Sequence, residues 1–190
     1  CLVGARKLYI IGLVLLVFLA AVFSWFFLLQ DYQKDRVLTF VNPASDPLGA
    51  GYNTNQAAIA IGSGKFFGRG LGFGSQSQLR FLPEAQTDFV FSVIGEELGF
   101  AGAITVLGLF GFVFWRLVRI VRSTDNDFAA TIVSGVAILF FSQLIINVGA
   151  NLGLLPVTGV TLPFVSYGGS SLMVNLLLVG IVQSMIEKRY

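Results

Sequence analysis

Four long apolar segments limit what this chain can fold into. They cover residues 8–29, 88–121, 128–155 and 172–186. An α-helix needs about 20 mostly apolar residues to cross the roughly 30 Å hydrocarbon core of a bilayer. Because 55% of the residues are hydrophobic and only 12% are charged, the sequence predicts an all-α polytopic membrane protein with about four transmembrane helices.

Basic residues beside these segments predict the orientation of the helices. With four spans they fall on one side of the membrane, at Arg6, Lys7, Arg116, Arg119, Arg122, Lys188 and Arg189. The positive-inside rule makes that side cytoplasmic, together with the C-terminus. The connections at residues 30–87 and 156–171 then share the outer face.

Both outer connections contain signals of ordered structure. Residues 30–87 predict a long structured extracytoplasmic loop with a short helix from Asn53 to Ile61. Residues 156–171 are broken by proline and glycine, and the last apolar segment is about 15 residues long, which is short for a full span. We therefore expect a re-entrant loop, with Ser170 or Ser171 capping a helix that begins below the membrane surface.

The second apolar segment, 88–121, is too long for one perpendicular span. Measured back from its arginines, the hydrocarbon core begins near Gly99, which leaves Asp88 to Leu98 at the outer interface. Glu96 and Glu97 then lie near the water boundary, where a charge costs less than at the bilayer centre.

The composition excludes several kinds of site. The chain contains one cysteine and no histidine, which excludes a disulfide framework, a Cys/His zinc site and a Ser/His/Asp triad within it. No soluble basic face is present to bind nucleic acid. Any chemistry must therefore use carboxylates, cations, amides and hydroxyls.

Asp88 has two interpretations of equal weight from its spacing. It caps the helix that begins at Phe89, accepting backbone N–H groups. Alternatively it is a general base beside Glu84 and Glu96, whose negative charges raise its pKa.

Two further polar patterns each leave an alternative open. Gln143, Asn147 and Asn151 repeat every four residues and share one helix face, which favours hydrogen bonding between helices over ligand contact. The segment SYGGSS, Ser166 to Ser171, suits either a structural turn or a pocket of free N–H groups for an anion such as pyrophosphate.

Three ordered motifs resemble the RodA/FtsW/SpoVE (SEDS) family of bacterial cell-wall synthesis. They are RVLTFVNPASDPLGAGYNTNQAAIAIGSG, GSQSQLRFLPEAQTDFVFSVIGEELGF and GLLPVTGVTLPFVSYGGSS. The resemblance implies that this chain is the last four of about ten spans in a plasma-membrane protein. GSQSQLRFLPE is more similar to the RodA, elongation-type branch than to the FtsW, division-type branch. Gln86 stands where the family usually has histidine.

The resemblance implies an inverting peptidoglycan glycosyltransferase that polymerises lipid II on the outer face, with Asp88 as the catalytic residue. This part alone is expected to be inactive. Its expected partners are a class B penicillin-binding transpeptidase and the elongation or division machinery. Lipid II flipping, a division-type polymerase role and a docking scaffold are the alternatives. Substrate contacts are expected at Arg80, Glu84, Thr87, Glu96, Ser166, Gly168, Gly169, Ser170 and Ser171. No residues are expected to ligate a metal, although Mg²⁺ or Mn²⁺ is one means of neutralising the pyrophosphate.

Overall fold

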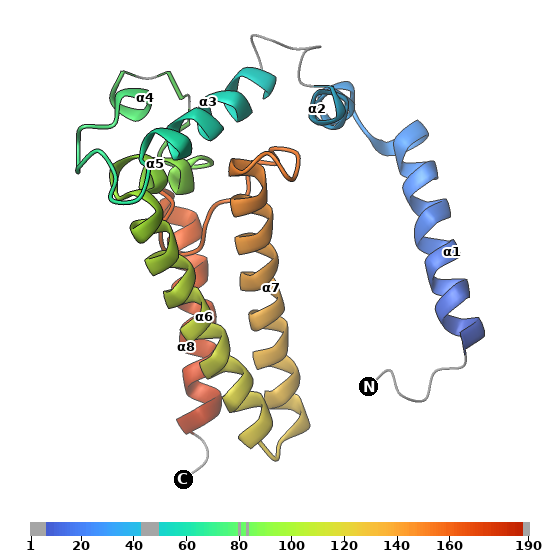
Figure 1. The fold of residues 1–190 in the computed structure, drawn as a ribbon. Coiled ribbons are helices and arrows are strands. Elements are labelled where there is room, and N and C mark those ends of the chain that lie inside the picture. Colours follow the sequence, from blue (N-terminus) through green and yellow to red (C-terminus); the bar gives the residue numbers. More distant parts are fainter. Residues whose placement is uncertain (1–6, 43–49, 80, 83, 188–190) are drawn as a thin grey trace.

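The computed structural model describes residues 7–42, 50–79, 81–82 and 84–187, and every regular element in these ranges is a helix (Figure 1). In chain order these are α1 (Lys7–Phe23), the π-helix η1 (Ser24–Leu28), α2 (Asp31–Val41), α3 (Ala50–Ser63), α4 (Ser75–Gln78), α5 (Val90–Glu97), α6 (Gly99–Ser123), α7 (Asp127–Asn151) and α8 (Gly169–Glu187). Helices α6, α7 and α8 form a bundle, and α1 stands apart from it.

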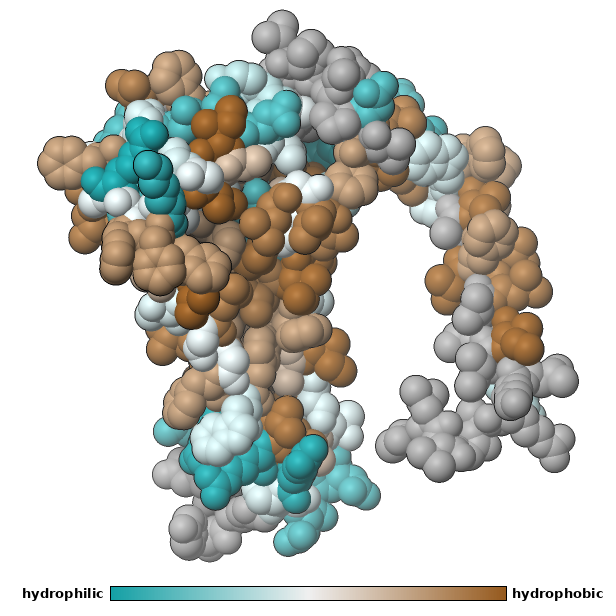
Figure 2. Space-filling view, in the orientation of Figure 1, coloured by the Kyte–Doolittle hydropathy of each residue, from teal (hydrophilic) through white to brown (hydrophobic). Residues whose placement is uncertain are grey.

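Two helices in the described ranges are long and apolar enough to cross a membrane by themselves. Helices α6 and α7 have 25 residues each, which corresponds to about 37 Å. Helix α8 has 19 residues, and α1 has 17 and continues into η1. On the face shown in Figure 2, apolar residues cover the middle of the bundle and hydrophilic residues gather at its two ends. This pattern is typical of a protein that spans a bilayer.

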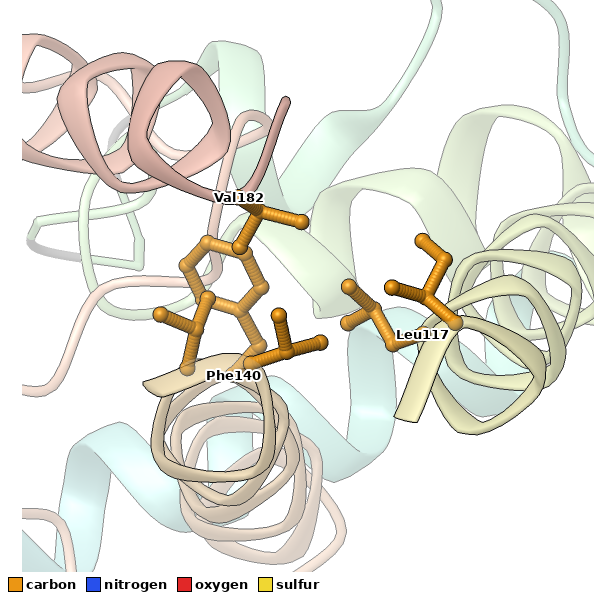
Figure 3. Close-up of a cluster of buried hydrophobic side chains, with 6 residues drawn as sticks. Leu117, Phe140 and Val182 are labelled. Carbon is orange, nitrogen blue, oxygen red and sulfur yellow. The ribbon is translucent and has the colours of Figure 1, made fainter. Parts of the chain in front are cut away.

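The core of the bundle is a cluster of aliphatic and aromatic side chains from all three of its helices. Its buried members are Leu117, Ile120, Val133, Val136, Phe140 and Val182. Figure 3 shows Leu117 of α6, Phe140 of α7 and Val182 of α8 converging on one point. In a bilayer, close van der Waals packing of such side chains holds helices together, so this cluster sets the relative positions of the three helices.

The second apolar segment divides into α5 and α6 at Leu98. The break interrupts the helical hydrogen bonds there, and residues 65–70 of the preceding loop supply replacements. The N–H groups of Arg69 and Gly70 donate to the carbonyls of Glu96 and Glu97, each over 3.0 Å, at the end of α5. In return, the N–H of Phe100 donates to the carbonyl of Lys65 over 2.9 Å at the start of α6. Gly99 has a φ of 67°, in the left-handed region where glycine is strain-free. The break lies at the boundary predicted between interface and hydrocarbon core.

Close packing of α3 on α5 holds the outer loop in place. A Cβ atom on Gly64, just beyond the end of α3, would overlap the carbonyl oxygen of Gly95 in α5. The two backbones therefore approach as closely as glycine permits.

Two sequence-based boundaries change. Helix α3 extends beyond the predicted Asn53–Ile61 at both ends. Helix α8 begins at Gly169 instead of residue 172, so Ser170 and Ser171 lie within its first turn. Neither serine precedes the helix, and the predicted capping role is wrong for that reason.

Candidate functional site

A tight turn from Glu84 to Asp88 precedes α5. The N–H groups of Thr87 and Asp88 both donate to the carbonyl of Glu84 over 3.1 Å. The Thr87 hydroxyl donates to the Glu84 carboxylate, also over 3.1 Å. Glu84 has a φ of 53°, a left-handed conformation that these three bonds stabilise. On the far side of the turn, Phe89 is 2% exposed and anchors the start of α5 in the loop core.

Two asparagine side chains of α7 hold the main chain at Asp88. The Nδ2 atoms of Asn147 and Asn151 donate to the Asp88 carbonyl oxygen over 3.0 and 2.9 Å. The Oδ1 atom of Asn151 accepts from the N–H and the hydroxyl of Ser92, over 2.9 and 2.6 Å. Both amides are buried. A buried polar group that loses its partner costs about 1–3 kcal/mol. This network therefore fixes the position of the Asp88 main chain at the end of the turn.

Asn147 also reaches the connection between α7 and α8, which the sequence predicts to be a re-entrant loop. Its Nδ2 atom donates to the carbonyl of Val160 over 2.8 Å. The spacing of the amides favours bonds between helices, and the bond from Asn151 to Ser92 of α5 is one. The other bonds of these amides go to the main-chain carbonyls of Asp88 and Val160.

The Asp88 carboxylate does not cap α5. The helix begins at Val90 with Phe89 as its N-cap, and no side chain provides the cap hydrogen bond. A Cβ atom added to Gly159 would lie 3.6 Å from Oδ2 of Asp88. The carboxylate is therefore adjacent to the re-entrant segment, at a place where a glycine leaves room beside it.

Burial raises the pKa of Asp88 above its usual range, and the negative charge of Glu84 raises it further. Hydrogen bonding by Thr87 and the positive charge of Arg36 act in the opposite direction. The guanidinium of Arg36 is held by the carbonyl of Val157 over 3.1 Å. Asp88 thus has an anionic neighbour, Glu84, which raises its pKa, and a cationic neighbour, Arg36, which lowers it.

The re-entrant loop is bonded directly to the turn that carries Asp88. The hydroxyl of Ser166 donates to the Thr87 carbonyl over 2.6 Å, and it accepts from the N–H of Leu162 over 2.8 Å. The N–H of Tyr167 donates to the Gln86 carbonyl over 2.8 Å. Two segments about 80 residues apart in sequence therefore form one unit.

Two cavities meet at this unit. One, of about 780 Å³, has a largely polar lining that includes Ser77, Gln78, Glu84, Thr87 and Glu97. The other, of about 500 Å³, is mostly apolar and is lined by residues such as Val90, Phe164, Val165, Gly168, Gly169 and Leu172. Ala85, Gln86, Val93 and Tyr167 line both. A ligand that combines a polar head with an apolar chain fits such a pair of cavities.

The structure brings some predicted site residues together and separates others. Glu84, Thr87, Ser166, Gly168 and Gly169 lie at the turn or line the cavities beside it. Ser171 bonds to Thr161 with 2.8 Å between their hydroxyl oxygens, and Ser170 is exposed on the first turn of α8. Arg80 lies outside the described residues.

Glu96 is placed away from both cavities. Its side chain is 0% exposed, and its two oxygens accept from the N–H groups of Gln76 and Ser77 over 2.8 and 3.1 Å. A carboxylate that is fully buried and hydrogen-bonded by the loop organises that loop, so we assign Glu96 a structural role in place of the expected substrate contact.

Sequence reasoning missed Arg36 and Gly159 as neighbours of Asp88. No local pattern marks either of them, because both are brought near Asp88 by long-range packing. Within the described ranges, no three or more acidic, histidine or cysteine side chains gather to hold a metal ion.

Taken together, the fold and site define an α-helical membrane protein with a single half-buried aspartate held between two loops at one end of its helix bundle. The chain belongs to the cell cycle protein family of FtsW, RodA and SpoVE, whose model matches residues 1–190.

Relatives from both branches of the family are similar to this chain. Peptidoglycan glycosyltransferase MrdB of Escherichia coli K12 is 46% identical over 165 residues, which are 87% of this chain and 45% of MrdB. A probable peptidoglycan glycosyltransferase FtsW of Thiomicrospira cyclica is 49% identical over 156 residues, 80% of this chain and 40% of that protein. The match therefore defines the family and does not separate the branches.

Solved structures show the same fold. A chain of a peptidoglycan synthase complex matches with a TM-score of 0.76 and 35% identity, over 97% of this chain and 50% of its own length. A mutant of the rod shape determining protein RodA from Thermus thermophilus matches with a TM-score of 0.55 and 38% identity, over 70% of this chain and 40% of its own. The chain spans about half the length of the relatives that it matches.

Proposed function

We propose that this chain is the C-terminal part of an inverting peptidoglycan glycosyltransferase that polymerises lipid II, with Asp88 as its general base. The position of Asp88 carries the proposal. Its main chain is fixed by two buried amides, while its carboxylate is free of the helix cap and has a raised pKa. A base whose pKa is raised toward the working pH transfers protons efficiently.

The proposed reaction is a direct displacement at the donor sugar. The 4-hydroxyl oxygen of the acceptor sugar attacks C1 of the donor sugar, and its proton passes to the Asp88 carboxylate. The bond between C1 and the pyrophosphate oxygen breaks, and undecaprenyl pyrophosphate leaves with the electron pair from the opposite side. Pyrophosphate needs neutralisation of its charge more than a proton. Negative charge develops on the departing pyrophosphate, while Asp88 becomes neutral as it takes the proton. Arg36 is the described cation that acts on Asp88, and we assign it to keeping Asp88 ionised before the proton is transferred.

Substrate contacts are assigned to the paired cavities. Glu84, Thr87 and Glu97 line the polar cavity, which suits the sugars and peptide. Gly168 and Gly169 line the apolar cavity, which suits the first isoprene units of the carrier lipid. The two cavities together match the amphipathic character of a lipid-linked sugar.

We further propose that α1, α6, α7 and α8 each cross the plasma membrane, with the site on the outer face and the C-terminus in the cytoplasm. In support, the start of α1 and the ends of α6 and α8 lie at the same end of the structure in Figure 1, and three arginines lie in the last third of α6. One similar structure is of a peptidoglycan synthase complex. By analogy, we propose that the whole protein acts with a class B penicillin-binding transpeptidase during elongation or division.

The test uses the whole protein, purified and supplied with labelled lipid II. Replacing Asp88 with Asn removes the base and keeps the main-chain acceptor for both amides. We expect glycan polymer formation to fall by about 10² to 10⁴-fold without loss of thermal stability. Asp125→Asn, in the turn between α6 and α7 at the other end of the bundle, is the matched control and should keep full activity.

Polymerisation at the normal rate by the Asp88→Asn protein would overturn the assignment of the base. Movement of labelled lipid II across vesicles by the wild-type protein, with no polymer formed when both faces are supplied, would favour transport instead.

A further inference from the structure

A second cavity region extends along the bundle from Phe164, which also lines the apolar cavity near Asp88, toward the α6–α7 turn. It is a groove of about 610 Å³ between α6 and α8, with α7 as its floor. Its apolar lining includes Phe112, Leu117, Ile120, Phe140, Val179 and Val182. Three of these, Leu117, Phe140 and Val182, are the converging side chains in Figure 3. The proposed reaction uses none of them.

One charged side chain opens onto this apolar groove. Arg116 lies on α6 one turn from both Phe112 and Ile120, so all three share one helix face. It is 17 residues from the start of α6 at Gly99, or about 26 Å along the helix axis. With a hydrocarbon core that begins near Gly99 and is about 30 Å thick, Arg116 lies just inside the far boundary, where an arginine is costly unless it is paired.

Within the described part of the chain, Arg116 makes no hydrogen bond or ion pair. The next arginine, Arg119, differs because its guanidinium lies 5.4 Å from the centre of the Trp115 ring. Arg122 is exposed in the last turn of α6. Among these three arginines, Arg116 is therefore the one that lines the groove without a partner in the described residues, and an anion in the groove would pair with it.

The polar groups of the groove are confined to one end. Gln183 of α8 lines it opposite Arg116. At the other end, the rings of Phe164 and Phe140 meet edge to face with their centroids 5.3 Å apart. From Arg116 toward Phe164 the groove is apolar. A ligand that fits must carry a negative head at the arginine end and an apolar chain toward Phe164.

We propose that this groove binds one anionic phospholipid from the membrane leaflet that contains the α6–α7 turn. The phosphate pairs with Arg116 and accepts from the Gln183 amide, and one acyl chain lies along Phe112, Phe140 and Val179. Basic pockets between transmembrane helices bind anionic lipid head groups in this way. The lipid would join α6 to α8 at a level where the groove separates them.

The experiment measures lipids that remain bound to the whole protein. The protein is reconstituted with equal amounts of phosphatidylglycerol and phosphatidylcholine, extracted gently and examined by native mass spectrometry. We expect one phosphatidylglycerol to be retained in preference. Arg116→Gln should reduce that preference about fivefold, as one arginine contributes about that much near a membrane surface. Arg122→Gln is the matched control and should keep it.

A second pair of variants tests the acyl-chain part without changing any charge. Val179→Trp fills the groove and should abolish retention, whereas Val174→Trp, on α8 outside the groove, should not. Equal loss from Arg116→Gln and Arg122→Gln would mean general attraction of surface charge and would overturn the proposal. So would unchanged retention in Val179→Trp, or equal retention of the two lipids by the wild-type protein.

Discussion

The side-chain amide of Asn151 lies 2.9 Å from the carbonyl oxygen of Asp88, and its own oxygen accepts two hydrogen bonds from Ser92. One buried side chain therefore joins the turn before α5, the first turns of α5 and the outer end of α7. The site keeps its geometry through this contact, which leaves the Asp88 carboxylate free.

Replacing Asn151 with Ala should lower the free energy of unfolding by about 1–3 kcal/mol, because it leaves the buried hydroxyl of Ser92 without its acceptor and removes one of the two donors to the Asp88 carbonyl. It should also lower kcat for polymerisation more than it changes KM, because the substitution shifts Asp88 and leaves the residues that line the substrate cavities unchanged. Asn147 still holds the Asp88 carbonyl, so activity should be reduced and not abolished. Chemical denaturation and steady-state kinetics of the whole protein measure the two effects.

Gln143 supplies the control for that prediction. It lies two turns earlier on α7, and its buried Oε1 atom has no hydrogen-bond partner in the described residues. Gln143→Leu should be neutral or slightly stabilising, because it removes an unsatisfied polar atom. A loss equal to that of Asn151→Ala would show that any polar residue on this face matters, against the specific role of Asn151.

The pH dependence of activity should move in opposite directions when the two charged neighbours of Asp88 are neutralised. The base works when ionised, so activity rises with pH through its raised pKa. Glu84→Gln removes a negative charge that raises this pKa and should shift the acid limb of the kcat profile to lower pH. Arg36→Gln removes a positive charge that lowers it and should shift the limb to higher pH. If both variants shifted the acid limb in the same direction, Asp88 would not be the group whose ionisation sets that limb.

Glu96 and Glu97 are adjacent, and we expect their variants to differ. Glu96→Gln places an amide donor against N–H groups that need an acceptor, so stability should fall by about 1–3 kcal/mol. Glu97 lines the polar cavity, so Glu97→Gln should raise KM for lipid II with little change in stability. Thermal unfolding and substrate titration separate these effects, and a raised KM for Glu96→Gln at unchanged stability would contradict its structural role.

Two glycines near the end of α3 give a second matched pair. Gly64→Ala forces a methyl group into the carbonyl oxygen of Gly95 and should destabilise the loop by about 1–3 kcal/mol. Gly62 lies within α3 and has no atom within 4 Å of the added Cβ, so Gly62→Ala should stabilise by about 0.5–1 kcal/mol. Denaturation midpoints of the two variants should therefore move to opposite sides of the wild-type value.

The membrane class and the break near Gly99 could be predicted because each has a local or compositional signal. Apolar length marks the spans, and the arginines of α6 mark the depth of the helix that follows Asp88. The carboxylate could also be placed at the end of the bundle from these signals. Its capping role was equally plausible until the structure showed that α5 begins at Val90 without a side-chain cap.

The partners of the polar residues could not be predicted, because they depend on contacts between distant segments. The spacing of Asn147 and Asn151 indicated one face of α7 but not that this face meets the Asp88 carbonyl. Glu96 looked like a ligand of the outer cavity, since a carboxylate at the end of an apolar segment usually faces water. The fold instead closes residues 75–77 over it.

The re-entrant loop meets the Asp88 turn through main-chain carbonyls, those of Gln86 and Thr87. A backbone acceptor is present whatever side chain the residue carries. The side chain of Gln86 is exposed and borders both cavities. Position 86 is therefore free to diverge without undoing the attachment of the two loops, and it is a place where evolution can change the ligand preference of the site while its framework stays intact.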